Sequence, residues 1–429
     1  MEIVVLIIYT AIFSGLILKS KLFEKKNIPR HYLLGFFLIK AVLGIVYGIL
    51  FQKHLNGKDT FVYFNESKII FNTFKDNPLY YLQLTFGVND YRPEPPHLLP
   101  YIDAMNFWYD QGNYFMVRLN SIFQLFSFGY YNVHALFISF MSFIGVFNIF
   151  NFLSEQHQKL SKYYLFAIFL IPSFLFWPSG LHKEAVVTFA IGLILNGVIK
   201  LEKKQFNITT LLMLGIGFGS LALVRFYVFI LITPALVAFY LSKTYKPIYA
   251  FASVYFISFS TIFTLQKIFP SINFLNELII RQRSFIRLVG NTTFPMDPLE
   301  PTWGDLFSNL PWAIINPFIR PLPFECDKLL CMLSSIETWV LLLGFILFLI
   351  FIDVRKMANS RIALFSLFFS FSIMVIIGLL VNNSGAIVRY RSFVLPFLII
   401  GFSLSSKIPK MSIGLMRSFF SKKHLVSKN

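Results

Sequence analysis

Three polar side chains, Asp59, Tyr63 and Glu66, follow a long apolar segment at a spacing of four and then three residues. In a helix this spacing places all three on one face. A carboxylate at such a position can deprotonate an incoming hydroxyl group or bind a cation. We therefore predict that Asp59 and Glu66 are catalytic and that Tyr63 binds substrate. A structural interpretation stays open beside this one, because Asp59 also fits the N-cap of a helix whose first turn starts at Thr60.

A second group of ionisable residues, His182, Lys183 and Glu184, follows the helix-breaking segment Pro178-Ser-Gly and opens the next apolar segment. A glutamate in the first turn of a helix complements the helix dipole, whereas a cation there is unfavourable. Helix formation therefore does not explain the positions of His182 and Lys183. We predict that this triplet binds substrate.

Three arginines, Arg225, Arg389 and Arg391, lie at the ends of apolar segments. An arginine in such surroundings normally pairs with another group or lines a wet cavity. Its planar guanidinium group binds phosphate through two hydrogen bonds. We predict substrate binding for all three, with extension toward lipid head groups as the alternative.

Arg320 and Glu325 lie in a proline-rich segment that precedes another apolar segment, which Glu337 enters. Proline stiffens a loop and so helps to preorganise the side chains between the prolines. We predict that Arg320 and Glu325 bind substrate. A purely structural loop is an equal alternative.

The composition indicates that most of the chain lies in an apolar environment. Of 429 residues, 56% are hydrophobic and 14% are charged, and the mean hydropathy is +0.67. A soluble domain has about 25% charged residues. The apolar residues form long runs, and we predict an all-α integral membrane protein with about 11 transmembrane helices.

The predicted spans are approximately 3–18, 32–51, 134–153, 163–177, 185–200, 208–224, 226–242, 247–265, 338–353, 361–381 and 393–405. The pair 163–177 and 185–200 fits either a tight helical hairpin or a partly re-entrant segment. The first span follows Met1-Glu2 without the basic residues of a cleavable signal peptide, so we expect it to be retained, with the N-terminus outside.

Alternation from that N-terminus places six segments in the cytoplasm, namely 19–31, 154–162, 200–207, 243–246, 353–361 and the tail from 405. These segments hold 21 of the 38 Lys and Arg residues and four of the 20 Asp and Glu residues. Their net charge is therefore +17, against +1 for the rest of the chain. The positive-inside rule predicts this asymmetry, which accounts for the basic charge without a nucleic-acid partner.

We predict a single polytopic membrane domain, 1–405, followed by a basic cytoplasmic tail, 406–429. Two large loops, about 52–133 and about 266–337, lie on the non-cytoplasmic side of this topology. Connections of that length are usually functional. The oligomeric state is left open.

Two stretches in these loops, 114–128 and 276–289, have the amphipathic pattern of helices that lie at a membrane interface. Both cysteines, Cys326 and Cys331, fall in the second loop. Their spacing permits a disulfide, and two unpaired thiols fit equally well.

The sequence lacks a Walker loop, a His and Cys cluster for a metal and a GxSxG motif. No cofactor is indicated, and no motif supports a divalent metal. We therefore expect any chemistry to come from residues near the outer membrane surface.

Taken together, these segments resemble polytopic bacterial envelope-glycan enzymes, namely GT-C-type glycosyltransferases and Wzy-type O-antigen or exopolysaccharide polymerases. The resemblance lies in the pattern of many helices with large outer loops and in three short motifs. These are Gly57-x-Asp59-Thr-x-x-Tyr-Phe, Pro178-Ser-Gly-Leu-x-Lys183-Glu184 and Arg389-Tyr-Arg391-x-x-x-Leu-Pro396. In GT-C enzymes the acidic residue usually follows the first helix, whereas Asp59 follows the second, as an extra N-terminal helix would explain.

This resemblance implies a location in the bacterial inner membrane, contact with membrane lipids, a polyprenyl-(di)phosphate-linked saccharide donor and a saccharide acceptor. Nucleotide sugars are cytoplasmic, so an outward-facing site needs a lipid-borne donor. Asp59 would take a proton from the acceptor hydroxyl. The arginines and Lys183 would neutralise the charge that grows on the departing phosphate.

Two other functions stay open. Lys40 in the second span, together with Gly and Pro residues in 211–220 and 231–234, fits a transporter or flippase for lipid-linked or anionic substrates. Almost no ionisable residue lies at mid-span, which counts against transport. The other alternative is a non-catalytic membrane scaffold for an envelope complex.

Overall fold

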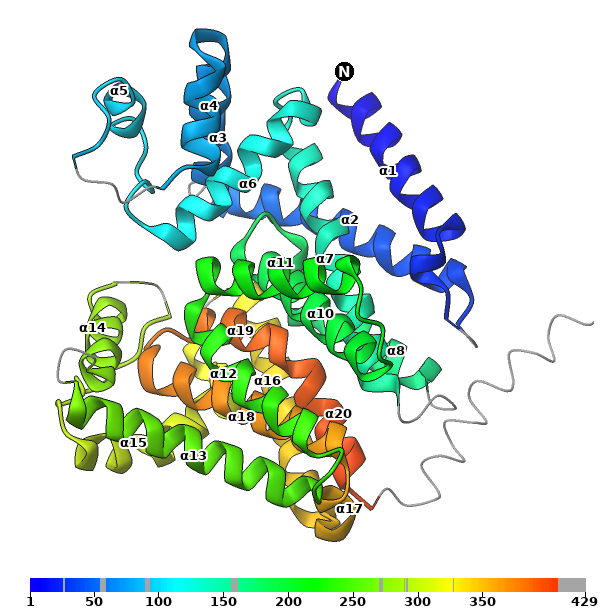
Figure 1. The fold of residues 1–429 in the computed structure, drawn as a ribbon, viewed down its shortest axis with the longest axis vertical. Helices are drawn as coiled ribbons and strands as arrows, with labels where there is room; N and C mark the ends of the chain where they lie inside the picture. Colours follow the sequence, from blue (N-terminus) through cyan, green and yellow to red (C-terminus); the bar gives the residue numbers. More distant parts are fainter. Residues whose placement is uncertain are drawn as a thin grey trace, which may run out of the picture. The chain divides into compact units, whose positions relative to one another are not determined.

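The structure is a computed structural model and describes residues 1–25, 28–54, 59–88, 93–155, 161–269, 273–288, 290, 292–326 and 328–407. The regular secondary structure of these residues is helical (Figure 1). The predicted all-α class is therefore confirmed. Gly57 of the first motif and the tail from residue 408 lie outside the described residues.

Among the described residues, eight helical segments are long and apolar enough to cross a membrane. They are α1 (Glu2–Lys19), α2 (Arg30–His54), α7 (Tyr131–Ser154), α10 (Lys183–Glu202), α13 (Pro247–Ile268), α16 (Leu329–Phe351), α18 (Arg361–Leu380) and the run of α19 (Ser384–Arg391), η5 (Ser392–Val394) and α20 (Leu395–Ser405). Two shorter apolar helices, α11 (Ile208–Val224) and α12 (Phe226–Leu241), coincide with two further predicted spans.

Two predicted boundaries differ from the observed ones. Residues 163–177 do not form one helix, because α8 (Ser161–Phe169) ends before Pro172, where α9 (Pro172–Phe176) begins and leads into η3 (Trp177–Ser179). A proline fits the first turn of a helix, whereas in the interior it removes a backbone hydrogen bond and kinks or breaks the helix. In addition, α16 begins at Leu329 rather than at 338, so Glu337 lies inside this helix.

The predicted outer loops contain further helices. The first holds α3 (Thr60–Asp76), α4 (Pro78–Phe86), α5 (Leu99–Ile102) and α6 (Gln111–Ser127), and the second holds α14 (Phe274–Ile286), α15 (Trp303–Ile319) and η4 (Pro323–Glu325). Short helices η1 (Lys21–Phe23) and α17 (Val354–Ala358) lie in predicted cytoplasmic segments. Both stretches predicted to be amphipathic helices are thus helical, as α6 and α14.

Helix α6 turns its polar side chains inward. Asn120 and Gln124 are buried, whereas Leu125 and Phe126 are exposed. The amide of Gln124 donates to Ser67 Oγ of α3 at 2.9 Å. An arrangement with polar groups inside and apolar groups outside suits an apolar solvent, because buried polar groups must find partners within the protein.

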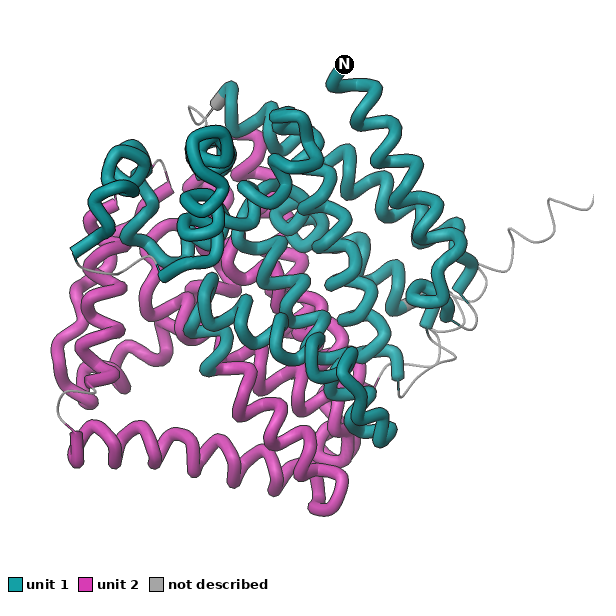
Figure 2. Tube along the Cα trace, turned by 45° about the horizontal axis from the view of Figure 1, so that its top comes forward, with its two compact units in different colours: residues 1–230 teal, residues 231–429 magenta. Residues whose placement is uncertain are grey.

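The chain divides into two compact units, Met1–Ile230 and Leu231–Asn429 (Figure 2). The single domain over 1–405 stays a prediction. In the first unit, α7 and α10 approach closely at Gly145 and Gly192, where a Cβ on Gly192 would lie only 2.6 Å from Gly145 Cα. In the second unit, a Cβ on Gly378 of α18 would lie 2.8 Å from Ala313 Cα of α15. Small residues permit such close contact between membrane helices.

In the first unit, the starts of α3 and α10 and the residue after α11 lie near one another, because Asp59 contacts His182 and Arg225 pairs with Glu184. At the other end of α10, Lys203 Nζ pairs with Glu155 Oε1, after α7, at 3.0 Å. The first unit therefore has one end with the predicted site residues and an opposite end with predicted cytoplasmic segments.

Candidate functional site

The loop between η3 and α10 is held firmly by the neighbouring helices. Lys40 Nζ of α2 donates to Ser179 Oγ at 3.0 Å, and Ser139 Oγ of α7 donates to the Ser179 carbonyl oxygen at 2.7 Å. Gly180 packs against the ring of Tyr47, where no Cβ would fit. The Pro178-Ser-Gly break therefore brings His182 to a defined place at the start of α10.

His182 and Glu184 form the buried centre of the site, and the side chain of each is 1% exposed. His182 Nδ1 is hydrogen-bonded to Glu184 Oε2, and Glu184 Oε1 accepts from Arg225 Nη2 at 2.9 Å. The Lys183 N–H also lies 2.9 Å from Nδ1. We assign the Nδ1 proton to the bond with Glu184, because a bond to a carboxylate is the stronger of the two. This tautomer leaves Nε2 to interact with other groups.

Asp59 faces that nitrogen, with Oδ2 at 3.6 Å from His182 Nε2, and its side chain is 44% exposed. Helix α3 begins at Thr60 as predicted, but the Asp59 side chain makes no capping hydrogen bond. Capping alone therefore does not describe Asp59. Its φ of 41° is uncommon for a residue other than glycine, and strained residues often lie at functional sites. Asp59 thus connects the buried His182 to the solvent-accessible surface.

Lys183 extends toward the N-terminus of α6. Its Nζ lies 4.0 Å from Asp110 Oδ1, and Asp110 also caps α6 by accepting from the Asn113 N–H at 3.0 Å. A Cβ on Gly112 would lie 3.2 Å from Nζ, so glycine leaves room for the ammonium group. The sequence analysis missed Asp110, Gly112 and Asn113. The pattern Asp110-x-x-Asn113 indicates a helix start, but only the structure shows that Lys183 lies there.

Tyr63 lies beside this site. Its side chain is buried, its hydroxyl donates to Asn113 Oδ1 at 2.6 Å, and its ring centroid is 6.2 Å from that of His182. We name Asp59, His182, Lys183, Glu184 and Arg225 the Asp59 cluster. Tyr63 links this cluster to the first turn of α6 through Asn113.

Glu66 is also buried, but it binds a different part of the chain. Its carboxylate accepts from the Asn106 N–H at 2.7 Å, from Asn106 Nδ2 at 3.1 Å and from the Phe107 N–H at 3.3 Å. Burial raises the pKa of Glu66, and these hydrogen bonds partly oppose that rise. The contacts favour a role in holding the turn at 106–107, so the geometry adds no support to its predicted catalytic role.

The second unit contains a separate group of predicted site residues. Arg320 Nη1 pairs with Glu325 Oε1, and Glu325 Oε2 accepts from the Leu322 N–H at 3.0 Å and from Ser384 Oγ at 3.2 Å. The Arg320 guanidinium group also lies 3.8 Å from the centroid of the Phe294 ring. Both oxygens of Glu325 thus bind groups that carry no titratable proton near pH 7.

Arg391 belongs to the same group and is fully buried. Its Nη1 donates to the carbonyl oxygens of Pro317 and Arg320, and its Nη2 donates to Thr338 Oγ1. We name Arg320, Glu325 and Arg391 the Arg320 cluster. Its contacts favour bracing of the loop between α15 and α16. The substrate-binding role predicted for Arg391 stays a prediction that this burial does not support.

Arg389 is half-buried and lies over its neighbour, with the guanidinium group 4.7 Å from the Tyr390 ring centroid and Nη2 donating to the Tyr390 hydroxyl at 2.8 Å.

Cys326 and Cys331 form a disulfide. Their spacing had permitted this pairing without requiring it.

The Asp59 cluster can move a proton. A carboxylate that orients an imidazole prepares the other ring nitrogen to accept a proton, and Asp59 stands between that nitrogen and solvent. The separation of 3.6 Å exceeds a hydrogen bond, as is common for catalytic contacts in the absence of substrate. Lys183 and Arg225 add two cations to the same region.

Within the described part of the chain, no three His, Cys, Asp or Glu side chains are arranged to hold a metal ion. Comparisons with protein-family models, with curated proteins and with solved structures found no match to this chain.

Proposed function

We propose that this chain is a polytopic glycosyltransferase or polymerase of the bacterial inner membrane, which uses polyprenyl-(di)phosphate-linked sugars at the outer face in surface polysaccharide assembly. The observation that carries the proposal is the buried array of Arg225, Glu184 and His182, which ends at the half-exposed Asp59. Such an array suits removal of a proton from a hydroxyl group.

In the proposed reaction, the acceptor hydroxyl lies against the Asp59 carboxylate. Its oxygen forms a bond to the anomeric carbon of the donor sugar, and the bond from that carbon to the phosphate oxygen breaks. The hydroxyl proton passes to Asp59 and on to His182 Nε2, while the polyprenyl (di)phosphate leaves with the bonding electrons. Lys183 and Arg225, whose side chains are 12% and 14% exposed, are the cations of the cluster that would neutralise the leaving phosphate.

The proposal includes eleven crossings, with the N-terminus outside and the C-terminus in the cytoplasm. The first unit supports this sidedness. The Asp59 cluster lies at one end of α10, and the ion pair of Lys203 with Glu155 lies at the other, in predicted cytoplasmic segments. The basic segments gather on the cytoplasmic side in such a topology.

The test measures sugar transfer from a polyprenyl diphosphate-linked donor by purified protein, together with glycan chain length on cells. We expect Asp59→Asn and His182→Gln each to reduce transfer by about 10²- to 10⁴-fold, because each removes a step of the proton path. Asp103→Asn is the matched control, because Asp103 is an exposed carboxylate in the same predicted outer loop. Normal transfer and normal glycan in both variants, at unchanged protein level, would contradict the proposal.

A second candidate function is transport, which one observation favours. Lys40 is fully buried in the middle of α2 and donates to Ser179 Oγ at 3.0 Å, and no salt bridge of Lys40 is found among the described residues. Ionisable residues buried inside membrane helices often mark a substrate or ion pathway. Substrate-dependent uptake into proteoliposomes that Lys40→Met abolishes and Asp59→Asn leaves intact would favour transport over glycosyl transfer.

A further inference from the structure

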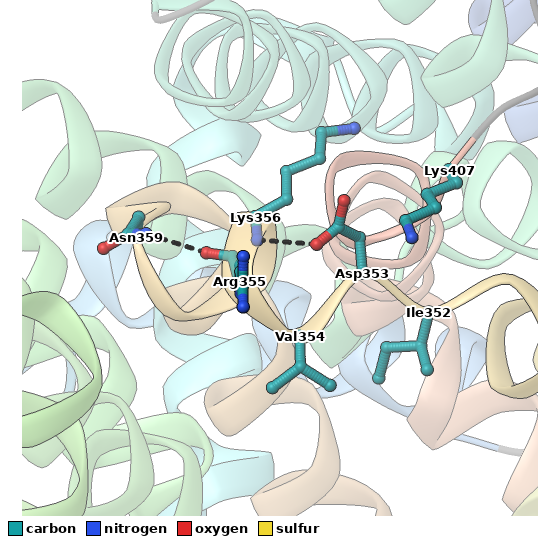
Figure 3. A pocket seen from close by; sticks show the side chains of 7 residues that line it. All are labelled: Ile352, Asp353, Val354, Arg355, Lys356, Asn359 and Lys407. Atoms are coloured by element: carbon teal, nitrogen blue, oxygen red, sulfur yellow. Dashed lines mark hydrogen bonds between the residues drawn. The ribbon is translucent and has the colours of Figure 1, made fainter.

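A surface cavity of about 550 Å³ lies in the second unit, where α16 ends, α18 begins and α20 ends (Figure 3). Two segments form its base. Asp353 N–H donates to the Ser405 carbonyl oxygen, and Lys407 N–H donates to the Phe351 carbonyl oxygen, both at 2.8 Å. These contacts tie the residues after α16 to the residues after α20. Backbone hydrogen bonds therefore fix the two segments that form the cavity.

Three cations and one carboxylate line this cavity, namely Arg355, Lys356, Lys407 and Asp353. In the view of Figure 3, the Asp353 side chain lies between those of Lys356 and Lys407. The Asp353 side chain has a structural role, because its Oδ1 caps α17 by accepting from the Lys356 N–H at 3.0 Å. Lys356 Nζ donates to the Ser406 carbonyl oxygen at 3.0 Å, which fixes the position of this ammonium group while other N–H bonds remain to it.

The surroundings of the cavity fit the depth of lipid head groups. Three helices of membrane-spanning length end or begin beside it. Val354, which lines the cavity, is 60% exposed, and Ile350 at the end of α16 is 66% exposed. Charged residues at the ends of membrane helices next to exposed apolar side chains are placed to meet a phosphate and the hydrocarbon beside it.

We infer that this cavity binds a phosphate group through Arg355, Lys356 and Lys407. The guanidinium group of Arg355 supplies paired donors to the phosphate oxygens, and the two ammonium groups supply further charge. Asn359, whose amide donates to the Arg355 carbonyl oxygen at 2.9 Å, closes the short helix that carries the first two cations. An anionic phospholipid and a soluble phosphate both present this chemistry. The inference does not depend on the proposed glycosyl transfer.

The experiment follows thermal unfolding of the full-length protein, purified in detergent and delipidated. Phosphatidylglycerol, phosphatidylcholine and inorganic phosphate are titrated separately. We expect phosphatidylglycerol or inorganic phosphate to raise the unfolding temperature of the wild type, and phosphatidylcholine to have a much weaker effect. Stabilisation by phosphatidylglycerol alone assigns the site to a lipid, and stabilisation by inorganic phosphate assigns it to a soluble ligand.

The double variant Arg355→Ala with Lys407→Ala tests the residues. We expect its apparent Kd for the stabilising ligand to rise on the order of tenfold or more. The matched control is Lys243→Ala with Lys246→Ala, which removes two exposed cations from another predicted cytoplasmic segment of the same unit. We expect the control to bind within about twofold of the wild type, because neither lysine lines the cavity and exposed charges are screened by salt.

Single variants Arg355→Gln and Lys407→Gln keep the test decisive if the double variant does not fold, and each is expected to weaken binding by several-fold. Equal weakening in the control pair, or no stabilisation of the wild type by either phosphate-bearing ligand, would overturn the inference.

Discussion

The Asp59 cluster and the Arg320 cluster are both built on an arginine paired with a glutamate, yet they differ in what the glutamate holds with its second oxygen. In the Asp59 cluster that oxygen binds the imidazole of His182. In the Arg320 cluster the second oxygen of Glu325 accepts from a backbone N–H and a serine hydroxyl. An imidazole exchanges protons near neutral pH, whereas an amide and a hydroxyl do not.

This difference shows that an arginine paired with a glutamate can serve different ends. Glu184 is a link in a path that reaches Asp59, with 44% of its side chain exposed. By contrast, Glu325 accepts from Ser384 and Arg391 donates to the Arg320 carbonyl oxygen, so both hold the chain around them in place. We therefore expect substitutions in the Asp59 cluster to lower activity and substitutions in the Arg320 cluster to lower stability.

Arg391→Ala should have the largest effect on stability. It removes three hydrogen bonds and leaves two buried carbonyl oxygens without these donors. We expect a loss of roughly 3–5 kcal/mol in the free energy of unfolding, or failure of the protein to accumulate. Thermal unfolding in detergent measures it. Arg281→Ala, at an exposed i,i+4 pair, is the control and should change stability by about 0.5 kcal/mol or less.

Glu184→Gln should lower sugar transfer by about 100-fold, because the amide cannot orient both His182 and Arg225 as a carboxylate does. The measurement is kcat with a lipid-linked donor, and unfolding is followed in parallel. Glu202→Gln, at the other end of the same helix, serves as the control. A change of less than about threefold in Glu184→Gln would remove the distinction between the clusters.

Glu325→Gln should show the opposite pattern. The pair with Arg320 is four-fifths buried, so its loss should lower the free energy of unfolding by about 1–3 kcal/mol. Transfer by the protein that remains folded should stay within about threefold of the wild type. Loss of transfer without loss of stability would place the Arg320 cluster in the reaction instead.

The pH dependence of stability tests the burial of Glu66, and its effect is the smallest of those expected here. Its pKa is raised by burial above the ordinary value of 4.5. The folded state therefore holds the proton more tightly than the unfolded chain does. The resulting contribution to stability is complete below pH 4.5 and is lost as pH rises through the raised pKa. Unfolding midpoints across pH 4 to 7 should show this decline in the wild type, and Glu66→Gln should flatten it.

Much of the fold was predictable because hydropathy is a local property. Apolar runs predicted α1, α2, α7 and α18 nearly to their ends. The prediction failed where a local signal was mixed. Pro172 divides the run 163–177, and the apolar residues around Cys331 extend α16 toward the N-terminus.

The candidate site was predictable only one residue at a time. Unusual placement singled out His182 and Lys183, because helix formation does not explain a cation at their positions, whereas Asp59 also fitted a helix N-cap. Placement did not reveal their partners. Asn106 and Phe107, which bind Glu66, and Thr338, which binds Arg391, carry no signal of these roles in the sequence.

By itself, the amino-acid sequence determined the helical class, the apolar segments and the concentration of positive charge in a few short segments. These follow from the free energy of transferring each residue into an apolar environment, which depends little on distant residues. Only the tertiary structure decided that His182 faces Asp59 while Glu325 faces a backbone N–H. Such contacts depend on how helices far apart in the chain pack against one another, and a difference of a few ångströms decides whether a carboxylate orients an imidazole or braces a loop.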